Sequence, residues 1–380
     1  MQSPFIVNDT PLALYRYPLS QNNRSLQAWD AADEYLINYV SDENLVQADS
    51  RIMIFNDSFG ALASQFTQHQ TTVISDSFLA HQGIQENLAQ NNLEAPKLTL
   101  LDSMAELPQQ TDIILYKIPK SKALLTQQLI KIRETQTENT LFIAAARAKD
   151  IHSSTLKVFE KYLGTTTTSL AVKKARLVFS QLTATPHQDP FPTVWPLENT
   201  SFTISNHANV FAREKLDLGA RFFLEHLPQI KENQQVIDLG CGNGVIGLSV
   251  LDQQPNAKLT FVDESFMAVA SAEQNIKNNL PSTVAQCDFV ANDCLSGFEA
   301  NSADVVLCNP PFHQQQATTD HIAWQMLNDA RRVLKPGGEL RIIGNRNLAY
   351  HIKLKRIFGG CKTIASNKKF SIFSCFKNYS

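Results

Sequence analysis

The chain has 380 residues, 43% of them hydrophobic, with 34 Lys or Arg against 36 Asp or Glu and a formal net charge of −2. This length suggests two domains, and the hydrophobic content excludes wholesale disorder. No apolar run reaches the roughly 20 residues of a membrane span, and the start MQSPFIVNDT lacks the features of a signal peptide. We therefore expect a cytoplasmic protein that does not enter a membrane.

The cysteines point to the same compartment. They include no CxxC pair, and no group of histidines accompanies them at the spacing of a zinc site. We expect reduced, mostly buried thiols and no bound metal. The near-neutral charge gives no advance sign of a nucleic-acid partner, which usually meets a basic surface. The six cysteines are Cys241, Cys287, Cys294, Cys308, Cys361 and Cys375.

Strands and helices alternate along both halves of the chain. In the first half, apolar runs at 50–57 and 71–78 precede a helical stretch that ends at Leu93, and a further run follows at 111–120. In the second half, runs at 234–240 and 257–265 precede a helical stretch that ends at Leu280, and a further run follows at 303–312. This order predicts parallel βαβ units in an α/β fold.

A proline-rich segment separates the halves. Residues 181–200 contain four prolines and cannot continue a helix or a central strand. We predict an amino-terminal domain at 1–185, a linker at 186–200 and a carboxy-terminal domain at 201–380.

The two halves also match residue by residue, which suggests a duplication. The glycine run DLGCGNG of the second half is FNDSFGA in the first, and the second half's CNPPF is YKIPK. The amino-terminal domain is therefore expected to keep the scaffold and lack the site, serving stability or substrate recognition. At constant spacing, Asp76, Glu86, Asn91, Asn92 and Leu93 face Asp263, Glu273, Asn278, Asn279 and Leu280.

The run VIDLGCGNGVIG joins a buried strand to a helix. Its glycines allow positive φ and close approach of a ligand, and the helix N-terminus favours a carboxylate or another anion. Asp263, about 20 residues further on, can accept hydrogen bonds from both hydroxyls of an adenosine ribose. An Asn-Asp pair after the third strand can contact the adenine. The candidate cofactor residues are Asp238, Gly240, Cys241, Gly242, Asn243, Gly244, Asp263, Asn292 and Asp293.

Three interpretations of the glycine run remain open at this point. Gly242, Gly244 and Gly247 also fit GxGxxG, which is typical of nicotinamide cofactors. Asp238 opposes that interpretation, because its charge would repel a pyrophosphate and suits the cationic groups of S-adenosylmethionine. A tight turn that binds nothing is the third interpretation.

The sequence Asn309-Pro310-Pro311-Phe312 closes an apolar strand. Two prolines there form a stiff turn beside the ligand crevice of an α/β sheet. The Asn309 side-chain oxygen and the Pro310 carbonyl can then accept both N–H bonds of a planar amine, which stabilises the charge that develops when its nitrogen attacks. Phe312 offers a face for stacking a base. Asn309, Pro310 and Phe312 are thus the candidate catalytic residues.

The combination of DLGCGNG, Asp263 and NPPF resembles the class I methyltransferases that use S-adenosylmethionine to methylate amino nitrogens. With NPPFHQQ and the segment 206–228, it looks more specifically like bacterial ribosomal RNA guanine-N2 methyltransferases. That resemblance implies two tandem Rossmann-like methyltransferase domains, of which the first is degenerate. The segments ISNHANVF and LDLGARFF are most similar to those of members that act on 23S ribosomal RNA. Members that act on 16S ribosomal RNA remain the nearest alternative.

The resemblance also implies that the donor's methionine portion lies near residues 211–219, where Arg213 and Asp217 are candidates. A surface ion pair between these two at (i, i+4) spacing is the alternative. His313 is a further candidate for contact with phosphate or base.

The positive charge is concentrated at the carboxy-terminal end. Residues 331–380 contain twelve Lys or Arg and one acid, Glu339. This cluster, including Lys368 and Lys369, suggests contact with RNA phosphates, although such runs are often solvated surfaces. Lys173, Lys174 and Arg176 occupy the corresponding end of the first half. Other open possibilities are methylation of adenine N6 in DNA or of a glutamine amide, and a non-catalytic RNA-binding protein.

Overall fold

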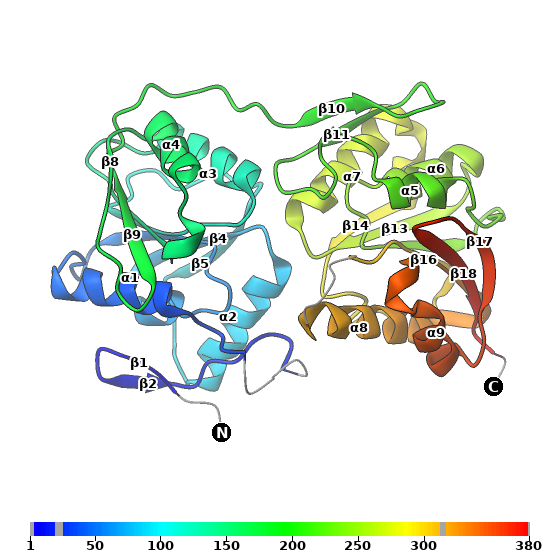
Figure 1. The fold of residues 1–380 in the computed structure, drawn as a ribbon, viewed down its shortest axis with the longest axis horizontal. Helices are drawn as coiled ribbons and strands as arrows, with labels where there is room; N and C mark the ends of the chain where they lie inside the picture. Colours follow the sequence, from blue (N-terminus) through cyan, green and yellow to red (C-terminus); the bar gives the residue numbers. More distant parts are fainter. Residues whose placement is uncertain (1–3, 20–25, 312–316, 379–380) are drawn as a thin grey trace. The chain divides into compact units, whose positions relative to one another are not determined.

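The computed structural model describes residues 4–19, 26–311 and 317–378. The chain divides into two compact units, Met1–Phe191 and Pro192–Ser380 (Figure 1). Each unit contains one seven-stranded sheet flanked by helices, and a short antiparallel hairpin accompanies each sheet. The predicted pair of tandem Rossmann-like α/β domains is thereby confirmed.

The elements of the amino-terminal unit are β1 (Phe5–Val7), β2 (Thr10–Leu12), α1 (Ala31–Asp42), β3 (Arg51–Phe55), η2 (Ala63–Gln65), β4 (Gln70–Ser75), α2 (Phe78–Gln90), β5 (Leu98–Asp102), β6 (Ile113–Lys117), α3 (Lys122–Thr135), β7 (Leu141–Arg147), η3 (Ala148–Asp150), α4 (Ser153–Tyr162), β8 (Thr166–Thr168) and β9 (Ala175–Ser180). Those of the carboxy-terminal unit are β10 (Thr193–Pro196), β11 (Thr203–Asn206), α5 (Leu218–Leu224), β12 (Gln235–Leu239), α6 (Val245–Gln253), β13 (Lys258–Asp263), α7 (Phe266–Asn279), η4 (Pro281–Gln286), β14 (Cys287–Ala291), β15 (Ala303–Cys308), α8 (Ala317–Val333), β16 (Leu334–Asn345), η5 (Arg346–Leu348), α9 (Tyr350–Phe358), β17 (Lys362–Ser366) and β18 (Phe370–Phe376).

The two sheets have the same topology. The strand order is β5-β4-β3-β6-β7-β9-β8 in the first and β14-β13-β12-β15-β16-β18-β17 in the second. In both sheets the first five strands are parallel, the sixth (β9 or β18) pairs antiparallel with the fifth, and the seventh (β8 or β17) pairs antiparallel with the sixth. Because parallel strands end at the same edge, this order determines which loops meet.

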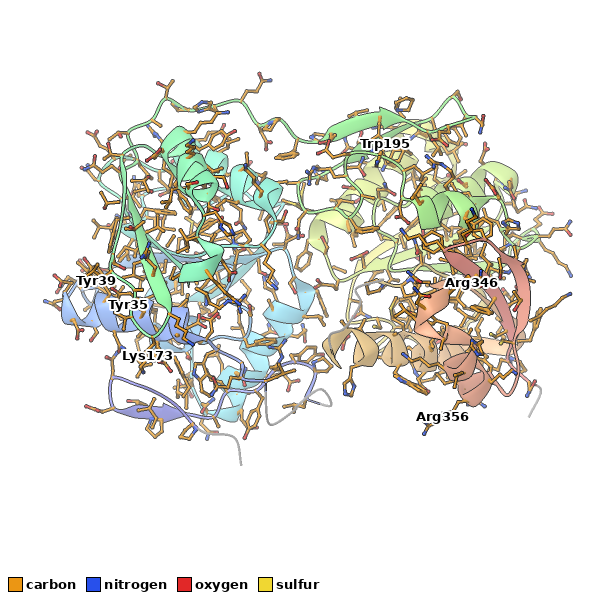
Figure 2. The ribbon with its side chains drawn as sticks, viewed as in Figure 1. Tyr35, Tyr39, Lys173, Trp195, Arg346 and Arg356 are labelled. Atoms are coloured by element: carbon orange, nitrogen blue, oxygen red, sulfur yellow. The ribbon has the colours of Figure 1, made fainter. Side chains whose placement is uncertain are left out.

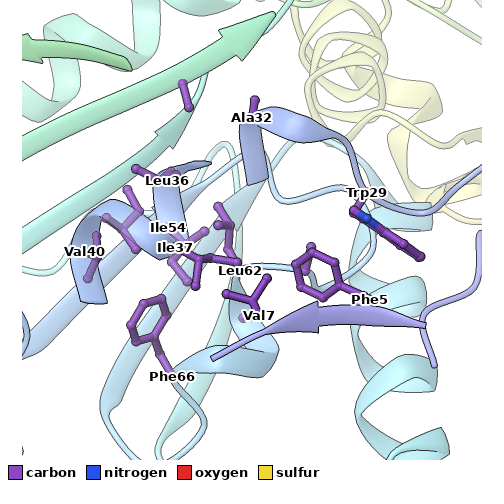
Figure 3. Close-up of a cluster of buried hydrophobic side chains, with 14 of the residues drawn as sticks. Phe5, Val7, Trp29, Ala32, Leu36, Ile37, Val40, Ile54, Leu62 and Phe66 are labelled. Carbon is purple, nitrogen blue, oxygen red and sulfur yellow. The ribbon is translucent and has the colours of Figure 1, made fainter. Parts of the chain in front are cut away.

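Each sheet is buried on both faces, as its nearly continuous apolar strands require. In the amino-terminal unit, Leu36 and Ile37 of α1 pack with Val7 and Ile54 on one face (Figure 3). Residues of α3 and α4 cover the other face. In the carboxy-terminal unit, α5, α6 and α7 cover one face, and α8 and α9 cover the other.

Buried asparagines show how the two units correspond. The Asn87 side chain bonds the backbone N–H and C=O of Tyr15, and Asn275 bonds those of Ser205 in the same way. The next turn repeats this pattern, with Asn91 on Ala13 and Asn279 on Thr203. The alignment in the sequence analysis, which paired Asn91 with Asn278, is therefore wrong by one residue in this region.

The proline-rich segment differs in extent from the expected linker at 186–200. The boundary between the units falls at residue 191, inside this segment. Thr193–Pro196 already form β10, which pairs with β11 of the carboxy-terminal unit. A proline is tolerated there because the hairpin has only two strands and Pro196 is the last residue of its strand. In the described part of the chain, no helix is long and apolar enough to cross a membrane, and no three His, Cys, Asp or Glu gather as a metal site.

Candidate active site

The parallel strands of the carboxy-terminal unit bring the predicted site residues to one edge of the sheet. Strand β12 lies between β13 and β15. The glycine run follows β12, Asp263 ends β13, and Asn309 follows β15. From β12 the chain first continues to β13 and β14 on one side, and then returns to form β15 on the other side of β12. Ligands of open α/β sheets bind in the crevice at such a switch point.

The glycine run forms a tight loop with positive φ angles that glycine adopts without strain. Gly240, Gly242 and Gly244 have φ of 71°, 53° and 77°. Among the described residues, a Cβ atom on Gly242 would meet no heavy atom within 4 Å, whereas one on Gly240 would lie 3.3 Å from the Met326 methyl. Gly244 is the N-cap of α6 and carries no side chain. The loop therefore leaves space over Gly242 at the N-terminus of a buried helix.

Asp263 is fixed beside this loop by two backbone amides. Its Oδ2 accepts the Gly242 N–H at 2.9 Å, and its Oδ1 accepts the Ser265 N–H at 3.0 Å. A carboxylate has about four acceptor positions, so both oxygens can also accept hydroxyl groups. The half-buried side chain therefore fits the role of holding a ribose at the open side of Gly242.

Asp238 lies beneath the loop and is only 1% exposed. Its Oδ2 accepts the Gly247 N–H at 3.0 Å. Burial raises the pKa of this carboxyl to about 7, and the nearby charge of Asp263 acts in the same direction. In the structure the carboxyl thus joins the strand to the first turn of α6, and its contact with a cofactor stays a prediction.

Other candidate cofactor residues use their side chains inside the protein. Cys241 is buried in the apolar cluster, and burial raises the pKa of its thiol well above the usual value. Asn243, 7% exposed, accepts the Val245 N–H at 3.1 Å. Asp293, 5% exposed, accepts the Gln325 amide at 2.8 Å. Cys241 and Asn243 are therefore expected to contact a ligand through their backbone atoms rather than their side chains.

Asn292 follows β14 directly and is held in a turn. Its side-chain amide donates to the carbonyls of Cys294 at 3.2 Å and Ser296 at 2.8 Å. Its backbone N–H donates to the Asp263 carbonyl at 3.0 Å. Asn292 and Asp293 thus lie at the same sheet edge as Asp263, one strand further from the glycine loop.

Asn309 has the most unusual environment among the candidates. Its Oδ1 is buried and accepts no hydrogen bond from the described residues. A buried acceptor without a partner costs about 1–3 kcal/mol, so such atoms are rare in folded proteins. The Asn309 carbonyl lies 3.9 Å from the Cβ position of Gly240. Asn309 therefore presents an unused acceptor next to the glycine loop.

The rest of the NPPF turn is only partly described. Pro310 is buried and Pro311 is exposed. The predicted catalytic Phe312 and the candidate His313 lie outside the described residues.

Arg213 and Asp217 do not form the ion pair considered above. The Arg213 guanidinium pairs with Glu214 at 2.8 Å and donates to the Ala208 carbonyl at 2.8 Å. The Asp217 carboxylate instead caps α5 by accepting the Ala220 N–H at 2.9 Å. A role of Arg213 in substrate binding stays a prediction.

Sequence reasoning missed three residues that support the site, two of them fully buried. Asn206 is fully buried, and its Oδ1 accepts the Asn243 amide at 3.0 Å. Asn275 is also fully buried and donates to the Asn243 carbonyl at 2.8 Å. Gln325 of α8 holds Asp293. The repeat of Asn87 at Asn275 was the signal that could have identified one of them.

The basic residues near the carboxy terminus fall into two groups. Five of them make hydrogen bonds or ion pairs within the fold. Arg332 donates to the carbonyls of Leu295 and Phe298, and Lys335 pairs with Asp304. Arg341 pairs with Glu339, Arg346 donates to the carbonyl of Asn367, and Lys377 donates to the carbonyl of Leu334. Lys368 and Lys369 lie exposed in the turn between β17 and β18. Arg346 and Arg356 also belong to this unit (Figure 2). The surface cluster is thus smaller than the twelve residues counted from sequence.

The amino-terminal unit has lost each part of this site. Its helix after the loop is reduced to the three-residue η2, and Asp57 accepts the N–H groups of Gly60, Leu62 and Ala63. Equivalent strand positions put Ser75 in place of Asp263. They put Lys117 in place of Asn309, and Lys117 pairs with Asp30 at 2.9 Å and Asp33 at 2.7 Å.

Comparisons with known proteins agree with two related units. Residues 2–184 match the RLMG N-terminal domain family, and residues 201–374 match the Methyltransferase small domain family. Ribosomal RNA large subunit methyltransferase G of Colwellia psychrerythraea is 60% identical, over 99% of this chain and 100% of that protein. The protein of the same name from Pseudoalteromonas translucida is 54% identical, over 98% and 97%.

A solved structure covers both units. The T. thermophilus 16S rRNA N2 G1207 methyltransferase, in complex with AdoMet and guanosine, has a TM-score of 0.75. It covers 100% of this chain, which covers 98% of it, at 18% sequence identity. This likeness concerns the fold.

Proposed function

The chain belongs to the family of ribosomal RNA large subunit methyltransferase G, and from this membership we propose how its site works. It is an S-adenosylmethionine-dependent methyltransferase that acts on ribosomal RNA of the large subunit. Its product is N2-methylguanosine in 23S ribosomal RNA. Since this substrate belongs to the ribosome, we expect the protein in the cytoplasm.

The observation that carries the choice of an amine is the Asn309 acceptor. A buried Oδ1 without a partner among the described residues is suited to accept an N–H bond that arrives with a substrate. The carbonyl of Pro310 is the second acceptor in this proposal. Together the two acceptors orient an exocyclic NH₂ group and stabilise the positive charge that its nitrogen gains during attack.

The cofactor residues are assigned on the same grounds. Asp263 holds the ribose hydroxyls, and the open space over Gly242 admits the part of the donor that lies against the loop backbone. S-adenosylmethionine, when bound, supplies a methyl group activated by its sulfonium. The guanine nitrogen takes that methyl group and then releases one proton to solvent, so no side chain need act as a strong base. Phe312 provides the stacking face in this scheme.

The two domains have different tasks. We assign catalysis to the carboxy-terminal unit, which contains residues 201–380, and support of the RNA to the amino-terminal unit, which contains residues 1–185. The hydrogen bonds of Asp57 to its loop and the Lys117–Asp33 ion pair support this division, because they satisfy the loop amides and leave a lysine where the amine acceptor would be.

The test is transfer of a tritiated methyl group to unmodified large-subunit RNA, followed by digestion and identification of the labelled nucleoside. We expect N2-methylguanosine from 23S RNA. Parallel reactions with 16S RNA, DNA and protein substrates serve as controls. Label in 16S RNA, in N6-methyladenine or in a protein glutamine, and none in 23S RNA, would overturn the proposal.

A further inference from the structure

The amino-terminal unit has a cavity of about 930 Å³ at the edge of its sheet that corresponds to the catalytic edge. Its lining includes Asn56 after β3, Lys117 at the end of β6 and Arg147 at the end of β7. By the paired positions of the strands, Asn56 corresponds to Gly240 and Lys117 to Asn309. The cavity thus occupies the place of the amine pocket in the catalytic unit.

The charge of this cavity differs from that of its catalytic counterpart. Lys117 is neutralised by Asp30 and Asp33, and Arg147 pairs with Asp150 at 2.7 Å. Three further cations line the cavity. Across the described ranges of the chain, no carboxylate lies within 4 Å of their charged nitrogens. They are Arg16, Lys120 and Lys122.

Arg16 is held in place rather than free to rotate. Its guanidinium lies 4.9 Å from the centre of the Phe59 ring and donates to the Gln27 carbonyl at 3.3 Å. Burial lowers the pKa of this half-buried group, because loss of solvent disfavours its charged form. A preorganised guanidinium of this kind fits a phosphate oxygen better than a mobile lysine does.

Helix α4 adds a second electrostatic contribution. Ser154 and Thr155 of its first turn line the cavity, and His152 at its N-cap position makes no side-chain capping bond. A helix N-terminus carries a partial positive charge that favours an anion. Fixed dipole and cations therefore act together on the same space.

The rest of the lining is mixed: it contains Ser58, the carboxylates Asp30 and Asp150, which are paired with Lys117 and Arg147, and a group of apolar side chains. Ile118, Pro119 and Leu125 line it together with Ala145 and Ala146. Ligand pockets of about 300–1,000 Å³ enclose a whole small molecule. A cavity of this size whose lining combines apolar side chains with cations suits a nucleotide, whose base has flat apolar faces and whose phosphate is anionic.

We propose that this cavity binds one unpaired nucleotide of the RNA substrate, with its phosphate on Arg16, Lys120 and Lys122 and its base against Ile118 and Leu125. This inference rests on the proposed function, because it takes the RNA as the ligand. The degenerate unit then retains the place of a flipped base and has exchanged the chemistry for an anchor. Anchoring at a second nucleotide would give the enzyme RNA affinity that does not depend on the target guanine.

The experiment uses the full chain and the double variant Lys120→Glu/Lys122→Glu. Both side chains are exposed, so the fold is expected to be unchanged. The control is Lys97→Glu/Lys161→Glu, which reverses two exposed lysines of the same unit, one before β5 at the opposite sheet edge and one near the end of α4. Binding of a 23S RNA fragment is measured by fluorescence anisotropy at several salt concentrations.

We expect the cavity variant to bind RNA at least tenfold more weakly. Its plot of log affinity against log salt should be shallower by about 0.7 for each lost phosphate contact. S-adenosylmethionine binding should be unchanged, and the control variant should stay within threefold of the unaltered protein. RNA affinity equal in the two double variants would overturn the proposal.

Two further measurements separate the alternatives. Calorimetry with guanosine 5′-monophosphate distinguishes RNA from a free nucleotide. Tight nucleotide binding that depends on Lys120 and Lys122, without any change in RNA affinity, would overturn the role in RNA binding. Methyl transfer by the unaltered protein is measured first. If it transfers no methyl group to RNA, the proposed function is refuted. If it transfers normally and the cavity variant binds RNA as tightly as the unaltered protein, only this inference is refuted.

Discussion

At Asn309, a substitution should sharply lower activity and hardly change stability. Replacement of Asn309 by Ala removes the acceptor proposed to stabilise the reacting amine. Loss of one preorganised hydrogen bond at a reacting centre typically costs about 10²–10³ in turnover, or about 2.7–4 kcal/mol of transition-state stabilisation. We expect a loss in kcat of that size or larger, with little change in affinity for the methyl donor.

The same substitution should hardly affect folding. The Oδ1 of Asn309 is buried without a partner among the described residues, so it contributes a penalty of about 1–3 kcal/mol rather than a bond. Its removal offsets the packing lost with the side chain. The free energy of unfolding should therefore change by less than about 1 kcal/mol, which corresponds to a few degrees in Tm.

Asn275→Ala is the matched control. This fully buried side chain accepts the Ser205 N–H at 2.7 Å and donates to the carbonyls of Ser205 and Asn243. Its loss leaves those groups unpaired and should cost about 2–4 kcal/mol of stability. Calorimetric unfolding and single-turnover methyl transfer are measured on both variants. If Asn309→Ala unfolds as readily as Asn275→Ala, or keeps its turnover, the reasoning about the unused acceptor is refuted.

The remaining predictions concern the loop. Asp263→Ala should raise the Kd for S-adenosylmethionine by roughly 10–100-fold, since hydrogen bonds to a charged group contribute about 1.5–3 kcal/mol; titration calorimetry checks this, and an unchanged Kd contradicts the assignment. Gly242→Ala should weaken donor binding and lower stability by about 1 kcal/mol. Gly247→Ala places a Cβ against the Phe261 ring and should lower stability by about 1–3 kcal/mol. Equal stabilities of the two variants would count against both expectations. Because burial raises the pKa of Asp238 to about 7, the folded protein keeps a proton that the unfolded chain loses, so stability falls as pH rises from about 4 to about 7. Asp238→Asn should flatten this dependence, as chemical denaturation at several pH values would test; an unchanged slope speaks against the buried carboxyl.

The repeated architecture could be predicted from sequence because apolar strands and helices follow a local pattern. The alignment of the halves was wrong by one residue where it depended on a match between solvent-exposed side chains. Glu86 is exposed, and its match to Glu273 constrains nothing. The buried asparagines Asn87 and Asn275, each bonded to the backbone of an incoming segment, determine the correct register. A hydrogen bond between residues far apart in the chain leaves no local pattern, so its meaning appears only in the fold.

The count of basic residues near the carboxy terminus overstated the exposed cations for a related reason. A count of Arg and Lys cannot distinguish Arg341, which is 9% exposed and paired with Glu339, from Lys368 in an exposed turn. The cations of the amino-terminal cavity show the opposite case. Arg16 and Lys122 are far apart in sequence and form no run, yet both line one cavity.

The two units together suggest how a catalytic fold becomes a binding fold. The change requires few substitutions, because the strands need not move. An aspartate in the loop satisfies the amides that would face a donor, as Asp57 does for Gly60 and Ala63. A lysine in place of the catalytic asparagine then removes the acceptor and forms its own ion pair with Asp33. The amino-terminal unit has a cavity at this sheet edge, and we expect the charges at its strand ends to decide which ligand it binds.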